Sequence, residues 1–220
     1  MNESSVNAID RRPIATRNRK WAQSATTWLA LRNVSPNAIS IAGMSACIAA
    51  GLALWLTSVE YNPVFWLIAA VGAQLRLTAN MLDGMVALAS KRASKVGELY
   101  NEVPDRVSDA AVFIGAGYAW GGNSTLGYIA TILAIFTAYV RAAGKIAGAH
   151  NEFGGPMAKQ HRMLVITVAC LYSVIVPRSW QILQFDHLDI GVMALALSVI
   201  VAGCLVTVVR RLQRIVCALK

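Results

Sequence analysis

Six long apolar segments constrain the fold of this chain more than any other feature of its sequence. A helix needs about 20 mostly apolar residues to cross the roughly 30 Å hydrocarbon core of a bilayer. Such segments are expected at 38–58, 64–82, 106–121, 125–147, 162–178 and 190–210. Only 14% of the residues are charged, whereas about a quarter is usual in soluble domains. The sequence therefore predicts an all-α, polytopic membrane protein with six transmembrane helices.

Residues 1–33 precede the first apolar segment and are polar and basic. They contain no apolar core followed by a small-residue cleavage site, so we do not expect a signal peptide. Their basic and aromatic residues include Arg17, Arg19, Lys20, Trp21 and Trp28. This composition predicts an amphipathic helix at the membrane interface, with a partly disordered tail as the alternative for 1–15. The short gaps further along predict one helical membrane domain over 34–220.

The basic residues fall almost entirely on one side of the predicted spans. Of the 20 Lys and Arg, the exceptions are Arg76, inside the second segment, and Arg178. This distribution follows the positive-inside rule and predicts an integral protein of the cell (inner) membrane with both termini in the cytoplasm. The net charge of +9 then reflects topology and attraction to anionic lipid headgroups, and no nucleic-acid partner is expected. The four cysteines lack metal-ligand spacing and are expected to serve as packing residues.

Residues 80–110 concentrate the acidic side chains of this otherwise apolar chain. Five of its 11 acidic residues lie there: Asp83, Glu98, Glu102, Asp105 and Asp109. At about 100° per residue, one face of the second segment carries Asn80, Asp83, Gly84 and Ala87. The acidic residues from 98 to 109 form a stripe on the third segment, with Asn101 at its edge. Two antiparallel helices would thus present facing acidic edges.

Acidic side chains stacked at helical spacing repel one another unless a cation lies between them. Arg76, Lys95 and Arg106 are the basic candidates close in sequence. A hard divalent cation suits the site better, because Mg²⁺ and Mn²⁺ prefer carboxylate and amide oxygens. The alternative is a solvated hairpin with an incidental acidic face, which is most open for Glu98.

The spacing of this stretch resembles the motif of the CDP-alcohol phosphatidyltransferase family, D-x2-D-G-x2-A-R-x8-G-x3-D-x3-D. The corresponding residues here are Asn80, Asp83, Gly84, Ala87, Leu88, Gly97, Asn101 and Asp105, with every spacing kept. Arg106 and Asp109 also match the "DRxxD" ending common in the family. The segment "SPNAIS" before the first span looks like the usual family entry, so the resemblance covers residues 34 to about 212.

The resemblance implies a reaction and a set of roles. A CDP-linked donor such as CDP-diacylglycerol would transfer its phosphatidyl group to a polar alcohol and release CMP. The four motif aspartates of the family hold two divalent cations, and the last aspartate is the general base. Carried over by position, Asp83 is a metal ligand and Asp105 is the catalytic base or the second ligand, and the nucleotide side is lined by Asp83, Gly84, Ala87 and Gly97. The resemblance further implies contacts with membrane lipids and a homodimer, which nothing in these residues establishes.

Two departures from the motif bear on activity. Asn occupies the first and third aspartate positions, and Leu88 replaces the usual Arg. Losing two carboxylates weakens the expected two-metal site. Glu102 lies on the same stripe and can compensate for the third aspartate, because Pro104 loosens the local helix and can turn the Glu102 side chain toward the site. We hypothesise an active branch that binds Mg²⁺ or Mn²⁺ through Asn80, Asp83, Asn101, Glu102 and Asp105, with support from Arg106 and Asp109. A non-catalytic homologue acting as a membrane partner is the alternative.

Basic residues beyond the motif fit a substrate pocket. Arg141 ends the fourth segment, and Lys159 and Arg162 begin the fifth, where they are expected to bind the phosphate of an acceptor. The alternative, which explains these three residues equally well, is that they are the basic residues usual at the cytoplasmic ends of transmembrane helices. His150 and His161 are expected to be interfacial polar residues. A transporter or channel is a further alternative, but it would require charged residues deep in several spans. The charged residues instead cluster at one face of the membrane, which favours chemistry at the membrane interface. The acceptor alcohol is left open.

Overall fold

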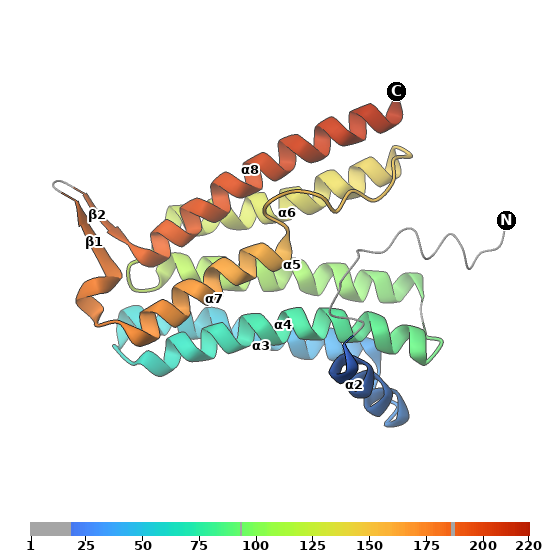
Figure 1. Ribbon diagram of the computed structural model, residues 1–220, viewed down its shortest axis with the longest axis horizontal. Coiled ribbons are helices and arrows are strands. Elements are labelled where there is room, and N and C mark those ends of the chain that lie inside the picture. Colours follow the sequence, from blue (N-terminus) through green and yellow to red (C-terminus); the bar gives the residue numbers. More distant parts are fainter. Residues whose placement is uncertain (1–18, 93, 186–187) are drawn as a thin grey trace.

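The computed structural model describes residues 19–92, 94–185 and 188–220. Its helices are α2 (Lys20–Leu31), α3 (Pro36–Val59), α4 (Pro63–Ala89), α5 (Lys95–Tyr118), α6 (Ser124–Ile146), α7 (Lys159–Ile175) and α8 (Val192–Leu219). A short 3-10 helix, η2 (Arg178–Gln181), and two strands, β1 (Ile182–Phe185) and β2 (Leu188–Gly191), lie between α7 and α8 (Figure 1). The predictions for Arg17 and for the tail at 1–15 lie outside the described residues.

Polar side chains define where four of the long helices begin. Their N-cap residues are Ser35, Asn62, Ser94 and Asn123, and the side-chain oxygen of each accepts a backbone N–H from the first turn. Such caps satisfy donors that the helix itself leaves unpaired. Proline follows directly in α3 and α4, where its missing N–H costs nothing. The short segments between the predicted spans thus contain the N-cap residues of these helices.

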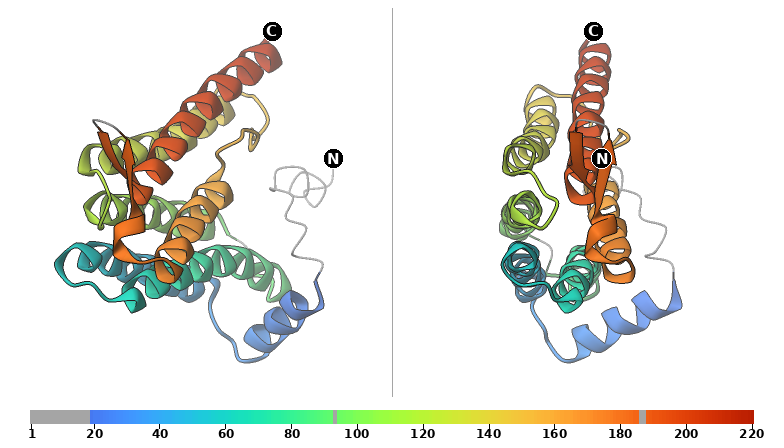
Figure 2. Two further views of the ribbon diagram at one scale, coloured as in Figure 1. Left: turned by 60° about the vertical axis from the view of Figure 1, so that its left-hand side comes forward. Right: turned by 90° about the vertical axis from the view of Figure 1, so that its left-hand side faces the viewer.

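The six long helices form two layers of three, seen end-on in the right-hand view of Figure 2. One layer contains α3, α5 and α6, and the other contains α4, α7 and α8. Within and between the layers, α3 packs on α4 and α5, α6 packs on α5 and α8, and α7 packs on α4 and α8. The core between them consists largely of small and aliphatic side chains.

Glycine allows α3 and α5 to approach backbone to backbone. A Cβ atom placed on Gly115 would lie 2.6 Å from the Cα of Gly51, and a Cβ on Gly51 would collide with the carbonyl of Ala111. A Cβ atom placed on Gly72 of α4 would likewise lie 2.6 Å from the carbonyl oxygen of Ala46 in α3. Close packing of this kind stabilises helix pairs in lipid, where the hydrophobic effect between helices is absent.

The outer surface of the bundle is apolar, as an integral membrane protein requires. Among the described residues, four helices are long and apolar enough to cross a bilayer: α3, α4, α6 and α8. The other two expected spans are helical as well, but α5 is rich in charges at its start and α7 has 17 residues. The helices begin and end close to the predicted segments, although α4, α5 and α8 extend further at their charged ends.

Helix α2 lies across one end of the bundle, against α4 (Figures 1 and 2). It buries Ala22 and Thr26, while Trp21 and Trp28 are about half exposed, at 50% and 55%. The Arg32 guanidinium stacks over the Trp28 ring at 4.8 Å. This is the arrangement expected for a helix with aromatics at a membrane interface.

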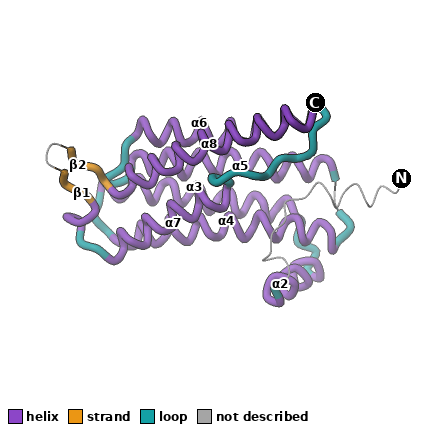
Figure 3. The backbone as a smooth tube through the Cα atoms, turned by 45° about the horizontal axis from the view of Figure 1, so that its top comes forward, coloured by secondary structure: helices purple, strands orange, loops and turns teal. Residues whose placement is uncertain are grey.

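The β-hairpin is a departure from the all-α prediction. Its two strands pair antiparallel, with Ile182 opposite Gly191 (Figure 3). It lies at the end of the bundle opposite α2, where Arg178 stacks on Trp120 at 3.5 Å from the ring centroid. The sequence predicts spans at 162–178 and 190–210 and no secondary structure between them. The structure corrects this prediction, because a β-hairpin lies there.

Candidate active site

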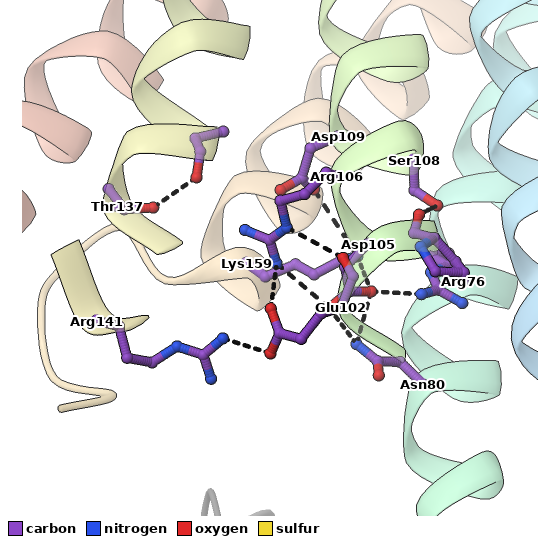
Figure 4. Close-up of polar contacts among 12 residues, drawn as sticks. Arg76, Asn80, Glu102, Asp105, Arg106, Ser108, Asp109, Thr137, Arg141 and Lys159 are labelled. Carbon is purple, nitrogen blue, oxygen red and sulfur yellow. Dashed lines mark hydrogen bonds and ion pairs between the residues drawn. The ribbon is translucent and has the colours of Figure 1, made fainter. Parts of the chain in front are cut away.

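Asp105 lies at the centre of a buried polar cluster built from three helices (Figure 4). It is 6% exposed on α5. Its carboxylate accepts hydrogen bonds from the Arg76 guanidinium and the Lys159 ammonium, and the Asn80 amide lies 3.1 Å from each of its oxygens. Arg106 completes the surroundings, with Nη2 3.6 Å from Oδ2. Helices α4, α5 and α7 therefore meet at this one carboxylate.

Asp83 lies beside this cluster and joins α4 to α3. Its Oδ2 accepts the Ser40 hydroxyl, and its Oδ1 lies 2.6 Å from the backbone nitrogen of Gly84. Arg76 in turn donates to the Ser40 carbonyl at 2.9 Å. A Cβ atom added at Gly84 would have no heavy atom within 4 Å, so the space beside the backbone of this residue is open.

Asp109 is one helical turn deeper than Asp105 and is fully buried. Arg162 donates to its Oδ2 at 2.8 Å, and the Lys159 ammonium lies 3.9 Å from its Oδ1. Arg162 also donates to the Met157 carbonyl at 3.0 Å. Buried charges are tolerated when paired and hydrogen-bonded in this way. Because Arg162 is only 2% exposed, these contacts favour a supporting role for it over direct contact with an acceptor.

Glu102 forms the exposed edge of the cluster. It is 46% exposed and pairs with Arg141 of α6, and Arg106 Nη2 lies 3.7 Å from its second oxygen. The Arg141 guanidinium also stacks over Phe153, 5.2 Å from the ring centroid. Helix α5 continues through Pro104. Glu102 thus faces α6 in this structure (Figure 4).

The connection between α6 and α7 (147–158) is held against α8. Arg211 donates to the carbonyls of Thr137 and Gly154 at 2.6 and 3.0 Å. The Met157 N–H donates to the Thr207 hydroxyl at 3.0 Å. Since α7 begins at Lys159, two residues after Met157, these contacts fix where Lys159 enters the cluster.

The remaining predicted residues line the outer part of the same region. Asn101, Gly97, Ala87 and His161 are half-buried, whereas Glu98 and His150 are exposed. The side chain of Lys95 lies outside the described ones. The structure therefore brings Asn80, Asp83 and Asp105 together with Lys159 and Arg141, and leaves Glu98 at the surface.

The chemistry of the oxygen donors can be compared with what a divalent cation requires. Among the described residues, no group of three or more His, Cys, Asp or Glu side chains gathers as a metal centre. Asp83 and Asp105 nevertheless offer carboxylate oxygens, and an amide turned about its last torsion would present an oxygen from Asn80. Hard oxygen ligands of this type suit Mg²⁺ and Mn²⁺. The residues fit a divalent cation through these groups, with fewer carboxylates than the family motif supplies.

One partner of the cluster, Ser40, was not predicted and was noted only as part of the "SPNAIS" entry. Arg76 was predicted as a candidate counter-ion of the acidic stripe, and the structure pairs it with Asp105. A fully buried arginine in the middle of an apolar segment is itself a signal, because an isolated charge there is costly. The roles of Thr207 and Arg211 depend on packing between α8 and the 147–158 connection, for which the sequence carries no local pattern.

Apolar helices long enough to cross a bilayer, with a polar cluster of Asp, Asn, Lys and Arg side chains between them, define the chain as an integral membrane protein with an internal polar site. No family model matches the chain. The inner membrane protein YnbA of Escherichia coli (strain K12) is 25% identical over 154 residues, covering 70% of this chain and 75% of that protein. The phosphatidylinositol phosphate synthase of Mycobacteroides abscessus is 28% identical over 176 residues, covering 76% of this chain and 74% of that enzyme.

Solved structures show the same fold. The phosphatidylinositol phosphate synthase of Mycobacterium tuberculosis with CDP-DAG bound has a TM-score of 0.68 at 18% identity, covering 90% of this chain and 94% of that one. The same enzyme in complex with manganese and citrate also has a TM-score of 0.68, with 88% of each chain covered. The curated relatives and the motif spacing agree with the resemblance to the CDP-alcohol phosphatidyltransferase family, and the solved structures share the fold of this chain.

Proposed function

We propose that this protein transfers a phosphatidyl group from a CDP-linked lipid, such as CDP-diacylglycerol, to a polar alcohol in phospholipid biosynthesis. The alcohol oxygen forms a bond to the phosphorus of the donor. The P–O bond to the leaving phosphate breaks, CMP departs, and the proton of the alcohol passes to a carboxylate. The reaction depends on Mg²⁺ or Mn²⁺.

One observation carries this proposal: Asp105, which matches the last aspartate of the family motif, has cationic side chains around it (Figure 4), and Asp83 is linked to it through Ser40 and Arg76. Relatives that share most of this chain are named phosphatidylinositol phosphate synthases. A related enzyme has been solved with CDP-DAG and with manganese. The donor class and the use of a divalent metal follow from these relatives.

Asp105 is the proposed base. It lies between donors from α4 and α7 that hold its carboxylate in one orientation, and a group that accepts a proton must be positioned within hydrogen-bond reach of the hydroxyl. Asn80, Asp83, Asn101 and Glu102 are the further oxygen donors toward a cation. When bound, a divalent cation neutralises the charge that develops on the phosphate oxygens.

The nucleotide end of the donor is proposed to lie along α4 and the start of α5. Asp83, Gly84, Ala87 and Gly97 are assigned there by position in the motif. The open space beside Gly84 supports this assignment, since a diphosphate must approach close to Asp83. Arg106 and Asp109 support the base from the same helix.

Arg141 and Lys159 are the proposed contacts for the acceptor. Both point into the cluster from helices outside the motif, and both offer donors suited to phosphate. Arg162 was assigned with them, and its proposed role is indirect, through its ion pair with Asp109. Because several relatives are named for making phosphatidylinositol phosphate, an inositol phosphate is the first acceptor to test.

The membrane arrangement is proposed to follow the six-span prediction, with α5 and α7 crossing beside the four strongly apolar helices. The end of the bundle with α2 and the active site faces the cytoplasm, in accord with the positive-inside rule. The relative named as an inner membrane protein supports that location. Lipids cover the apolar outer faces, and a homodimer is the assembly that the family resemblance implies.

The test is release of CMP by the purified protein in detergent. The mixture contains CDP-diacylglycerol, Mg²⁺ or Mn²⁺, and a pool of polar alcohols that includes inositol phosphate. We expect metal-dependent release that Asp105→Asn abolishes. Asp189→Asn is the matched control, because it makes the same change at an exposed carboxylate on β2. Equal release by the wild type and Asp105→Asn would refute the assignment of the base.

A non-catalytic membrane partner is the second candidate. The observation in its favour is that Asp105 is already paired with Arg76 and Lys159, while two motif aspartates are Asn. This candidate predicts that the wild type binds CDP-diacylglycerol without turnover of any alcohol in the pool. Isothermal titration of the donor alongside the CMP assay separates the two functions.

A further inference from the structure

The buried charges at this site already balance without any added ion. Three carboxylates, Asp83, Asp105 and Asp109, are each at most 6% exposed. Three cations lie among them at most 6% exposed as well: Arg76, Lys159 and Arg162. The protein itself therefore balances the charge of Asp83 and Asp105, the two carboxylates at motif positions, and of Asp109, which lies outside those positions and pairs with Arg162.

Arg76 is a permanent part of this balance. Its side chain is fully buried, and its guanidinium contacts both the Ser40 carbonyl and Asp105. A Cβ atom at Gly43 would lie 3.2 Å from Arg76 Nη1 and 3.3 Å from Cδ. Glycine at this position thus makes the room that the arginine occupies. An arginine does not lose its proton in a protein, so its positive charge stays beside Asp105.

Lys159 reaches the same carboxylate from α7. Its ammonium contacts Asp105 and lies 3.9 Å from Asp109, and the contacts between α8 and the 147–158 connection fix its position. Two protein cations therefore contact the carboxylate that matches the last aspartate of the motif. The positions that match the first and third aspartates, Asn80 and Asn101, carry no charge.

We propose that the site takes one divalent cation together with its donor, and that Arg76 and Lys159 supply the charge that a second cation supplies in the family motif. This inference rests on the proposed function. Each phosphate of the diphosphate donor carries one negative charge, so one divalent cation neutralises the donor. A second divalent cation would leave two excess positive charges in a buried site, where an uncompensated charge is costly.

The number of bound cations can be counted with Mn²⁺ as the probe. Mn²⁺ is titrated into the purified full-length protein in detergent with saturating CDP-diacylglycerol, and electron paramagnetic resonance measures the unbound ion. We expect one Mn²⁺ per chain and a frozen spectrum without coupling between neighbouring ions. The double variant Asn80→Asp/Asn101→Asp is expected to bind two Mn²⁺ per chain, with a coupled spectrum.

The matched control is Asn62→Asp/Asn123→Asp. It adds the same two carboxylates at helix N-caps, where the side-chain oxygen keeps its role. This control is expected to bind one Mn²⁺, like the wild type.

Two Mn²⁺ per wild-type chain, with a coupled spectrum, would overturn the inference, and so would a wild type that binds none. Two Mn²⁺ per chain can be counted whether metal-dependent CMP release is intact or absent, so the count and the proposed function fail separately. If Asn80→Asp/Asn101→Asp does not fold, the wild-type count alone decides.

Discussion

Replacing Asp109 by Asn tests the buried part of the site most directly. The change keeps the shape of the side chain and removes one charge from a position with 0% exposure. Arg162, whose Nη2 lies 2.8 Å from Asp109, then loses its counter-ion. Lys159 loses a second carboxylate 3.9 Å away.

The expected size of the effect follows from these distances. At an effective dielectric constant of about 20, unit charges roughly 4 Å apart attract by about 4 kcal/mol. Breaking a buried ion pair from one side costs about 3–5 kcal/mol. Arg162 keeps its hydrogen bond to the Met157 carbonyl, which places the expected loss at the lower end, about 3 kcal/mol. For a chain of this length, this corresponds to a fall in Tm of roughly 6–12 °C.

The assay is thermal unfolding in detergent, followed by intrinsic tryptophan fluorescence. Asp189→Asn is the control and is expected to stay within about 0.5 kcal/mol of the wild type, as exposed substitutions usually do. Combining Asp109→Asn with Arg162→Met should cost at least about 2 kcal/mol less than the sum of the two single variants, because each removes the same pair. A fall in Tm of under about 2 °C for Asp109→Asn would refute the pairing.

Three further predictions concern the fold and the rim of the site. Gly51→Val should destabilise the protein by about 1–3 kcal/mol or more through overpacking, whereas Gly84→Ala, with open space around it, should leave Tm nearly unchanged; thermal unfolding compares them. Arg141→Gln should change stability by less than about 1 kcal/mol, because the side chain of its partner Glu102 is about half exposed, at 46%, but should raise the KM for the acceptor in the CMP assay; an unchanged KM would count against acceptor binding. Arg211→Met removes hydrogen bonds from a charged group, each contributing about 1.5–3 kcal/mol, and should make the 147–158 connection more sensitive to limited proteolysis. Equal cleavage of the variant and the wild type would show that Arg211 does not hold this connection against α8.

The helices could be predicted because their determinants are local. Apolar length locates each long helix, and Ser35 and Asn62, followed by proline, define where two of them begin. The β-hairpin could not be predicted in the same way. Its strands have four residues each, too short for a periodic pattern to stand out beside two apolar segments.

In the candidate site, too, the residues set by local sequence could be predicted, and those set by the packing of distant helices could not. Helical periodicity alone places Asn80 and Asp83 on one face of α4, and the structure brings Asn80 within 3.1 Å of both oxygens of Asp105. The partners supplied by α3 and α7, Ser40 and Lys159, depend on how distant helices pack. No spacing rule connects residues that are 43 or 54 positions apart.

The separation of these partners along the chain has a consequence for membrane insertion. Asp105 and Asp109 leave the ribosome more than 50 residues before Lys159 and Arg162, which pair with them. Until α7 is made, Asp109 lacks both of its cations and Asp105 has only Arg76 and Arg106 near it, and a helix with a buried unpaired carboxylate partitions poorly into lipid. We therefore expect α5 to enter the lipid fully only together with α7, and a chain that stops after α6 to leave Asp109 without a counter-ion.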